Sequence, residues 1–310
     1  MPAAAYVFTT LDYPSTNGTS LSGISANTIV GSSSFGPFIY NGSTFTLFNN
    51  PLSSFNSLSG VSGNTVVGSY TQFVPPYLDA PSHGFIYNGS TFATVDDPLG
   101  ITGATSMGGT SVCGVSGITV VGYYLTEMVT LPPNSGSLVH GFLYNGSTFD
   151  TLDDPFAGPN GTEAHGVSGN TVVGYYVDAN GVDHGFSYNG SIYSTLDDPL
   201  GVNGSEALGV SGSTIVGYYI DSNDVDHGFV YNGSTFTTVD DPLGQDGTII
   251  NGIDGDTIVG QFIDDNGVTN GFVATNVPEP TTLGGVFLAC VTLIRRHRRH
   301  NVALPHRQQL

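Results

Sequence analysis

Residues 166–191 read GVSGNTVVGYYVDANGVDHGFSYNGS, a pattern that decides the fold because it returns along most of the chain. Its most constant part, HGFxYNGS, begins at His83, His140, His184 and His227, with degenerate copies at Gly36 and Asn270. The later copies lie about 43 residues apart, a period typical of architectures that repeat one supersecondary unit. The sequence therefore predicts a repeat protein.

Each repeat unit holds four short strand candidates. The six units begin at residues 6, 44, 91, 148, 192 and 235. In the unit at 148 the candidates read TFDTLDD, EAHGV, NTVVGYYV and HGFSYNG, which are rich in strand-forming residues and separated by Gly, Asn or Asp. Ser168-Gly169-Asn170 and Asn189-Gly190 fit tight hairpin turns. No helical periodicity occurs before residue 280.

Four antiparallel strands repeated six times predict an all-β fold, a β-propeller of six four-stranded blades over residues 1–276. A solenoid coil, at about 20 to 30 residues, fits this period less well. The chain starts inside a unit, so we expect residues 6–12 to pair with the blade made by residues 248–275. That pairing would close the ring and remove an exposed sheet edge. In the C-terminal segment, residues 277–310, we expect a short apolar helix.

Strand alternation places the tight SGN and YNGS turns on one face of the fold and the longer connections on the other. Of the 25 acidic residues, 21 lie on or beside the longer connections. The four exceptions are Asp150, Asp254, Asp256 and Glu279. Two insertions, Thr71 to Ser82 and Leu125 to Val139, fall on the same acidic face. Such loops often build a binding site, so they are candidate ligand-binding loops, with tolerated surface variation as the alternative.

The charge distribution excludes several functions. All five basic residues are arginines in the last 16 positions, whereas all 25 Asp and Glu residues precede Arg295. Histidine apart, residues 1–294 carry no side chain that could neutralise phosphate, which argues against nucleic-acid binding and phosphate chemistry. The two cysteines, Cys113 and Cys290, predict neither a disulfide framework nor a metal site.

Paired carboxylates occur in the four DDP segments, at 96–97, 153–154, 197–198 and 240–241. Such pairs can act as acid and base, but catalysis usually needs one residue unlike its counterparts, and these four copies are alike. The favoured interpretation is structural, with one Asp bonding its own backbone before Pro. Calcium binding and catalysis are the alternatives.

Three further loops space oxygen-bearing side chains at alternate positions, as calcium loops do. The candidate calcium ligands are Asp178, Asn180, Asp183, Asp221, Asn223, Asp226, Asp264 and Asn266. The distal Glu of an EF-hand loop is missing, and hairpin turns explain the same residues. Calcium is thus a candidate cofactor, and turn formation is the alternative.

The repeated histidines stand once per unit, and we expect each to bond an Asp or a backbone carbonyl within its blade. A metal at the axis would require them on the innermost strands. His165 has no counterpart in the other units and is interpreted as incidental. In the tyrosine pairs, such as Tyr175-Tyr176, we expect one side chain in the core, while the other could stack on a sugar.

The repeat segment at 166–191 resembles the HAF family of extracellular repeats, with HGF in place of the usual His-Ala-Phe. The resemblance covers residues 6–276 and gains its specificity from repetition. It implies an exported bacterial protein to which no activity is assigned.

The tail, residues 277–310, resembles a PEP-CTERM sorting signal. Its motif is Pro278, Glu279 and Pro280, followed by an apolar run over 281–294 and the basic residues Arg295, Arg296, Arg298 and Arg299. The resemblance implies a transient inner-membrane anchor with the basic cluster inside. An exosortase then cleaves near Pro-Glu-Pro, and the protein is released or attached to the surface. The charge asymmetry fits the positive-inside rule.

Two features depart from that pattern. The apolar run of 14 residues would extend about 21 Å as a helix, against a hydrocarbon core of about 30 Å. Residues 1–14 contain neither a charged n-region nor an apolar h-region. Because a sorting tail implies export, we expect a truncated or misassigned start rather than a cytoplasmic protein.

These features predict a non-catalytic, exported surface or matrix protein that binds extracellular polysaccharide or protein through the acidic face, with calcium assisting. The alternative is a secreted glycosidase or lyase that uses paired carboxylates on a propeller scaffold. Sialidase or phytase chemistry would need basic residues for its anionic substrates. The expected partners are an exosortase-type processing enzyme and an extracellular polysaccharide or matrix protein, with no nucleic acid.

Overall fold

The computed structural model describes residues 5–50, 55–71, 81–101, 108–129 and 136–277. Residues 8–275 form one compact unit. Residues 1–7 and 276–310 form a second, whose described residues, 5–7 and 276–277, are strand ends. The expected C-terminal helix and sorting motif lie outside the described residues. A search of the described residues finds no helix with the length and apolar character needed to cross a membrane.

Twenty-four strands and no helix occur in the described residues, in successive sets of four. The first strands of the sets are β2 (Thr19–Ser25), β6 (Phe55–Ser62), β10 (Gly109–Ser116), β14 (Thr162–Ser168), β18 (Gly204–Ser211) and β22 (Thr248–Asp254). The second strands are β3 (Thr28–Ser33), β7 (Thr65–Thr71), β11 (Thr119–Val129), β15 (Thr171–Val177), β19 (Thr214–Ile220) and β23 (Thr257–Ile263). The third strands are β4 (Gly36–Tyr40), β8 (Ser82–Tyr87), β12 (Gly136–Tyr144), β16 (Asp183–Tyr188), β20 (Asp226–Tyr231) and β24 (Thr269–Val277). The fourth strands are β5 (Phe45–Leu47), β9 (Phe92–Val95), β13 (Phe149–Leu152), β17 (Tyr193–Thr195), β21 (Phe236–Thr238) and, from the start of the chain, β1 (Ala5–Thr10).

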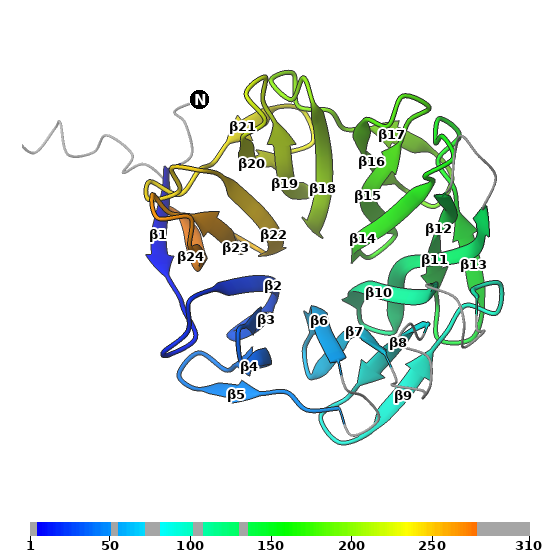
Figure 1. The fold of residues 1–310 in the computed structure, drawn as a ribbon, viewed down its shortest axis with the longest axis horizontal. Helices are drawn as coiled ribbons and strands as arrows, with labels where there is room; N and C mark the ends of the chain where they lie inside the picture. The colour runs from blue at the N-terminus through cyan, green and yellow to red at the C-terminus, as the bar shows by residue number, and fades with distance from the viewer. Residues whose placement is uncertain (1–4, 51–54, 72–80, 102–107, 130–135, 278–310) are drawn as a thin grey trace, which may run out of the picture. The chain divides into compact units, whose positions relative to one another are not determined.

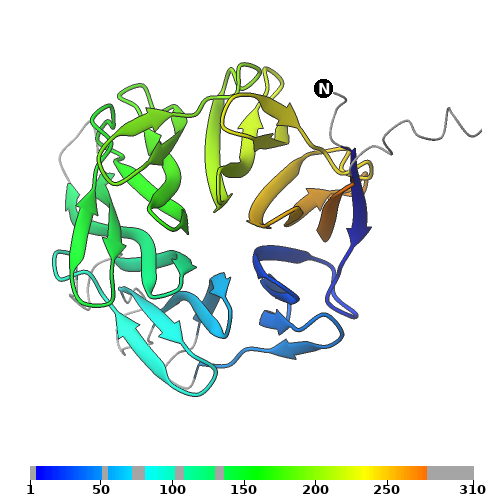
Figure 2. The same ribbon diagram turned by 180° about the vertical axis from the view of Figure 1, so that it is seen from behind.

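These strands form four four-stranded sheets and one eight-stranded sheet within the described residues. In the eight-stranded sheet, β6 to β9 and β10 to β13 are two antiparallel sets joined by one parallel pair, Gly109 with Ser82. Within residues 8–275 the sheets surround an axis, with the first strand of each set innermost (Figures 1 and 2). The predicted all-β propeller fold is confirmed.

The predicted tight turns are also present. β14 and β15 pair down to Ser168 and Thr171, and β16 and β17 pair down to Tyr188 and Tyr193. Gly169 has φ 58° and Gly190 has φ 94°, left-handed values that glycine adopts without steric cost. These two turns therefore fix the register of the hairpins that they join.

The sheets are offset by one strand from the sequence units. β17, which opens the unit at 192, pairs with β16 of the preceding unit because the short Asn-Gly turn joins them directly. The same offset places β1 beside β24 in the last sheet, where Leu11 N donates to Gly271 O at 2.9 Å and the Phe8 and Phe272 rings lie 5.3 Å apart. The expected pairing of the N-terminal strand with the last sheet is confirmed for the described residues.

The core lies within and between the sheets. Each third strand contributes one fully buried phenylalanine, and these are Phe38, Phe85, Phe142, Phe186, Phe229 and Phe272. Neighbouring sheets share apolar contacts, as where Val173 of β15 packs with Val210, Ile215 and Phe229 of the next sheet. Burying one phenylalanine stabilises the fold by about 1.5 to 3 kcal/mol.

One glycine on each innermost strand allows these strands to meet at the axis. These six, called the central glycines below, are Gly23, Gly60, Gly114, Gly166, Gly209 and Gly252. A Cβ added at any one of them would lie 3.1 to 3.3 Å from the Cα of a neighbouring central glycine. The contacts run in sequence and close between Gly252 and Gly23. Any side chain at these positions would push adjacent sheets apart.

Hydrogen bonds between the tight turns follow the same order at five of the junctions. Asp254 Oδ2 of the last sheet accepts from Ala26 N of the first at 2.6 Å. Equivalent bonds to serine hydroxyls link Gly63 to Ser25, Gly117 to Ser62, Gly212 to Ser168 and Gly255 to Ser211. Asp254 does not lie on the acidic loops, and its bond to Ala26 N links the last sheet to the first.

Candidate functional site

The antiparallel order of the strands separates two faces. The turn face carries the hairpins between first and second strands and between third and fourth strands, such as 168–171 and 189–192. The loop face carries the connections between second and third strands and those that lead to the next sheet, such as 178–182 and 196–203. The loop face holds most of the acidic residues that the sequence predicted there.

The two candidate ligand-binding loops differ in how much of each the structure describes. In Thr71 to Ser82, residues 72–80 lie outside the described residues. In Leu125 to Val139, β11 and β12 continue beyond their counterparts and pair from Leu125 with Val139 to Val129 with Gly136. This insertion is thus largely a longer hairpin, because its residues extend the ladder instead of leaving it.

Each repeated histidine is held inside its own sheet set on the loop face. In one set, His184 Nδ1 lies 2.8 Å from Asp197 Oδ2, and its ring stacks on Tyr176 at 5.1 Å. The Tyr176 hydroxyl lies 3.4 Å from Thr195 Oγ1. Equivalent groups are His83, Asp96 and Tyr70; His140, Asp153 and Tyr124; and His227, Asp240 and Tyr219. The expected bond between histidine and an aspartate is present, and these histidines stand on third strands, away from the axis.

The second aspartate of each DDP segment makes a buried structural turn. Asp154 is 3% exposed, its backbone N–H donates to Thr162 Oγ1 on the next innermost strand, and its Oδ1 accepts from Phe156 N at 2.9 Å. Asp97, Asp198 and Asp241 repeat this arrangement. Burial raises the pKa of Asp154, against the bond from Phe156 and nearby His184. These carboxylates are therefore turn formers, and the acidic face presents fewer acids than the sequence count suggested.

The same turn pushes an apolar side chain into solvent. The residue whose N–H is bonded by the buried aspartate is Leu99, Phe156, Leu200 or Leu243, and all four are at least 60% exposed. Asp153 and Asp197, the first members of their pairs, have side chains 48% and 40% exposed. The loop face thus presents a repeated pair of one apolar group and one carboxylate.

The candidate calcium ligands form turns within their own loops. Asp178 Oδ1 accepts from Asn180 N at 2.7 Å and from Val182 N at 3.0 Å. Asp221 and Asp264 make the same bonds in their loops, with Asn223 and Asn266 as partners. Asp183 and Asp226 instead begin β16 and β20, where burial raises the pKa of both carboxyl groups. No cluster of three or more metal-ligating side chains occurs among the described residues, and the geometry favours the turn interpretation.

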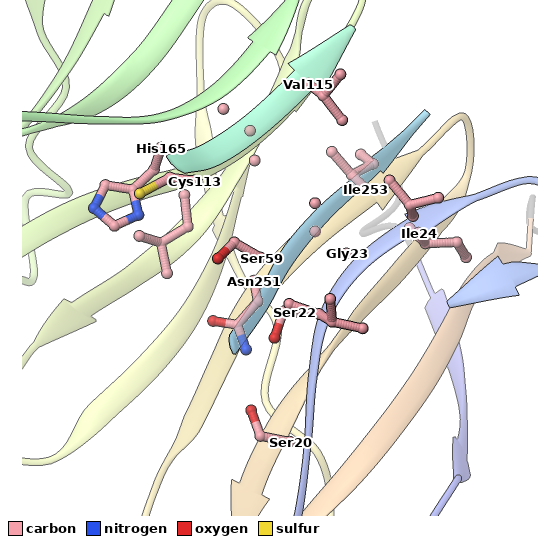
Figure 3. Close-up of a pocket in the computed structure, with 18 of the residues that line it drawn as sticks. Ser20, Ser22, Gly23, Ile24, Ser59, Cys113, Val115, His165, Asn251 and Ile253 are labelled. Carbon is pink, nitrogen blue, oxygen red and sulfur yellow. The ribbon is translucent and has the colours of Figure 1, made fainter. Parts of the chain in front are cut away.

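A cavity of about 710 Å³ lies on the axis between the innermost strands. Because these strands run in the same direction, equivalent residues form layers along it. The end nearer the turn face is apolar, lined by Ile24, Val61, Val115, Val167, Val210 and Ile253. Towards the loop face the lining becomes polar, and Figure 3 shows Val115, Ile24 and Ile253 at one end with His165, Asn251 and Ser20 towards the other.

Each innermost strand places a β-bulge residue on this cavity, just before its central glycine. These bulge residues are Ser22, Ser59, Cys113, His165, Leu208 and Asn251. A bulge leaves the extra residue out of the ladder, so its side chain is free of the packing that makes the strands alike. His165, which sequence reasoning treated as incidental, therefore belongs to the cavity lining.

Two glutamates, Glu163 and Glu206, make one side of the cavity acidic. His165 Nε2 lies 3.2 Å from Glu163 Oε2, and the Tyr218 hydroxyl donates to Glu206 Oε1 at 2.5 Å. Burial raises the pKa of Glu206 to about 7, against the bond from Tyr218. Tyr175, the other member of the pair with buried Tyr176, stacks on His165 at 5.4 Å. Its ring therefore contacts a protein side chain instead of the sugar that the sequence suggested as a possible partner.

Comparison with known proteins supports the fold alone. No family model matches the chain, and no curated protein matches it either. The β-propeller domain of the Trilobed protease from Pyrococcus furiosus, described as having an open velcro topology, is similar with a TM-score of 0.51 and 9% identity, over 85% of this chain and 97% of that one. A fungal lectin from Aleuria aurantia, a six-bladed β-propeller that recognises fucose, gives 0.49 and 14%, over 86% and 97%. At these identities the likeness concerns architecture.

Proposed function

We propose that this chain is a six-bladed, exported and non-catalytic propeller that binds an extracellular polysaccharide or matrix protein through its loop face. The blade number rests on reading the two antiparallel sets of the eight-stranded sheet as separate blades, which the closed series of six central glycines supports. Export rests on the resemblance of the repeats and the tail to exported families.

The observation that carries the binding function is the repeated display of an apolar group beside a carboxylate. On a flexible loop, a leucine or phenylalanine side chain can fold back onto the protein surface and leave water. Here the backbone N–H of each such residue donates to a buried aspartate, and this bond fixes the loop so that the side chain points into solvent. The same arrangement occurs four times on one face, at Leu99, Phe156, Leu200 and Leu243. A polymer with repeating units can engage several such sites at once, and its avidity then exceeds the affinity of any one site.

The test is binding to an array of polysaccharides and matrix proteins by the wild-type chain and by a variant with Leu99, Phe156, Leu200 and Leu243 all changed to Ser. We expect that variant to lose at least tenfold in apparent affinity. A matched control changes Ile118 and Ile192 to Ser, since they are 76% and 63% exposed on the turn face. Equal loss in both variants, or none in the first, would refute the loop face as the binding surface.

The same array distinguishes binding from catalysis. A non-catalytic protein leaves the bound polysaccharide intact over prolonged incubation, whereas a glycosidase or lyase shortens it. Product sugars in the wild type that disappear in Glu163→Gln and Glu206→Gln variants would replace the binding proposal with the enzymatic one.

Sorting through the tail is tested separately. Residues 270–310 are fused to an exported reporter in a host with an exosortase, and Pro278, Glu279 and Pro280 are changed to Ala. We expect processing and surface release to stop in the changed fusion. Equal processing of both fusions would show that the tail is not a sorting signal.

A further inference from the structure

Within the described residues, the axial cavity is lined by Glu206, and Glu163 bonds the lining residue His165, with no lysine or arginine beside either glutamate. All five arginines of the chain lie beyond residue 294, and the sequence contains no lysine. Glu163 and Glu206 occupy equivalent positions on the neighbouring strands β14 and β18, where each pairs with the second strand of its own sheet. Among the described residues that line the cavity, His165 alone can carry a positive charge.

Apart from His165, the groups around Glu206 are themselves acidic or neutral. Tyr218 on β19 donates to it, His165 and Glu163 on β14 act on it electrostatically, and Asp183 at the start of β16 adds a further negative charge. Tyr175 on β15 also lies within its field. Burial and neighbouring carboxylates raise the pKa of the Tyr175 and Tyr218 hydroxyls, so neither becomes anionic near neutral pH.

The remaining lining suits a ligand with several polar groups. Serine hydroxyls and amides occur on other strands, at Ser20, Ser22, Ser57, Ser59 and Asn251. Asn56 Oδ1 is buried in the same wall and accepts no hydrogen bond from any described residue. A volume of about 710 Å³ falls within the range of roughly 300 to 1,000 Å³ of small-molecule sites.

We propose that the axial cavity binds a small organic cation of the polyhydroxylated amine class, with its ammonium group at Glu206 beside the His165–Glu163 pair and its hydroxyl groups on the serine and amide side. An ammonium group supplies the positive charge that this wall lacks, donates up to three hydrogen bonds, and can lie against the Tyr218 ring. This site is separate from the loop face, so either proposal can fail without the other.

The proposal is tested by calorimetric titration of the full chain with glucamine and with sorbitol, which differ only in an ammonium in place of a hydroxyl. We expect glucamine to bind at least tenfold more tightly than sorbitol. Glu206→Gln keeps the shape and the bond from Tyr218 while removing the charge, and it should weaken glucamine at least tenfold and leave sorbitol unchanged. The control Asp256→Asn removes one charge from the exposed turn face and should change glucamine affinity less than twofold.

The pH dependence gives a second readout. A bound ammonium favours ionised Glu206, so binding releases a proton below about pH 7, the pKa of that carboxyl group. Glucamine affinity should therefore rise more steeply between pH 6 and pH 8 in the wild type than in Glu206→Gln. Equal affinity for sorbitol and glucamine, absence of binding at millimolar concentration, or an unchanged affinity in a folded Glu206→Gln protein would overturn the proposal.

Discussion

The central glycines and the bulge residues are adjacent on every innermost strand, yet they follow opposite rules. The glycines are the same at all six positions because each meets the backbone of the next sheet. The residues just before them are of five kinds, from Ser22 to His165 to Leu208, because a bulge side chain faces the cavity. The residue is the same in every repeat where close packing allows only one type. Where the side chain faces the cavity, the residue differs between repeats and can be a polar or charged group.

The largest expected effect comes from removing β1, one of the strands whose packing repeats in every sheet. Deleting residues 1–12 takes away β1 and exposes the edge of β24 together with Phe272, which loses its contact with Phe8. We expect the melting temperature to fall by at least about 10 °C, since 1 kcal/mol corresponds to roughly 2 to 4 °C in a domain of this size. Deleting only residues 1–4 is the control. Similar melts for the two deletions would show that β1 does not close the ring.

Adding one methyl group at a central glycine, and truncating the bulge residue beside it, compares the two kinds of position directly. A Cβ at Gly114 would lie 2.4 Å from His165 O, so Gly114→Ala must separate two sheets and should cost about 3 kcal/mol in the free energy of unfolding. Cys113→Ala, one residue earlier, removes a side chain that faces the cavity, and its cost should stay below about 1 kcal/mol. Urea unfolding measures both. Equal losses of unfolding free energy would mean that the bulge residues are as important to the packing of the sheets as the central glycines.

The fold was predictable because its determinants repeat. Six copies of one pattern, most of them with Asn-Gly and Ser-Gly turns, predict the sheets and the pairing of β1 with β24. That pairing already implies the offset between units and sheets, because the first strand of each unit, such as β17, is joined by the short Asn-Gly turn to the sheet of the preceding unit.

The cavity was less predictable because its residues do not repeat. His165 has no counterpart in the other repeats, so the repeat pattern assigns it no role, although a residue unlike its counterparts is what a chemical site usually needs. The sequence does not show which strand is innermost, so it cannot separate Glu163 and Glu206, on β14 and β18, from the acids of the neighbouring loops. The sequence did contain one signal for the cavity. The residue before the central glycine varies among the repeats, whereas the glycine itself is the same in all six.

Two kinds of aspartate turn should respond to pH in opposite directions. Burial raises the pKa of Asp154, so its contribution to stability is complete below the unfolded value of 3.8 and declines as pH rises through the raised pKa. Hydrogen bonds from Val182 N and Asn180 lower the pKa of Asp178, so its contribution is present above 3.8 and is lost as pH falls through the lowered pKa.

Asparagine keeps each turn acceptor and removes the titration. From pH 3 to pH 6, the unfolding free energy of Asp154→Asn should therefore rise relative to the wild type, whereas that of Asp178→Asn should fall. Urea unfolding at several pH values measures both differences. Parallel trends would show that burial does not separate the two turns.

The smallest expected effect concerns calcium. Asp178, Asp221 and Asp264 already accept two backbone N–H groups each, so a calcium ion would have to compete with the turn that shapes its own loop. A site that binds only the folded chain would add about 2.7 kcal/mol at one hundred times its Kd. We expect millimolar calcium to shift the melting temperature no more than sodium chloride of equal ionic strength, in the wild type and in a triple Asp→Asn variant at these positions alike. A calcium-specific shift that the triple variant loses would reverse the interpretation, because these repeated loops would then bind metal and not merely turn the chain.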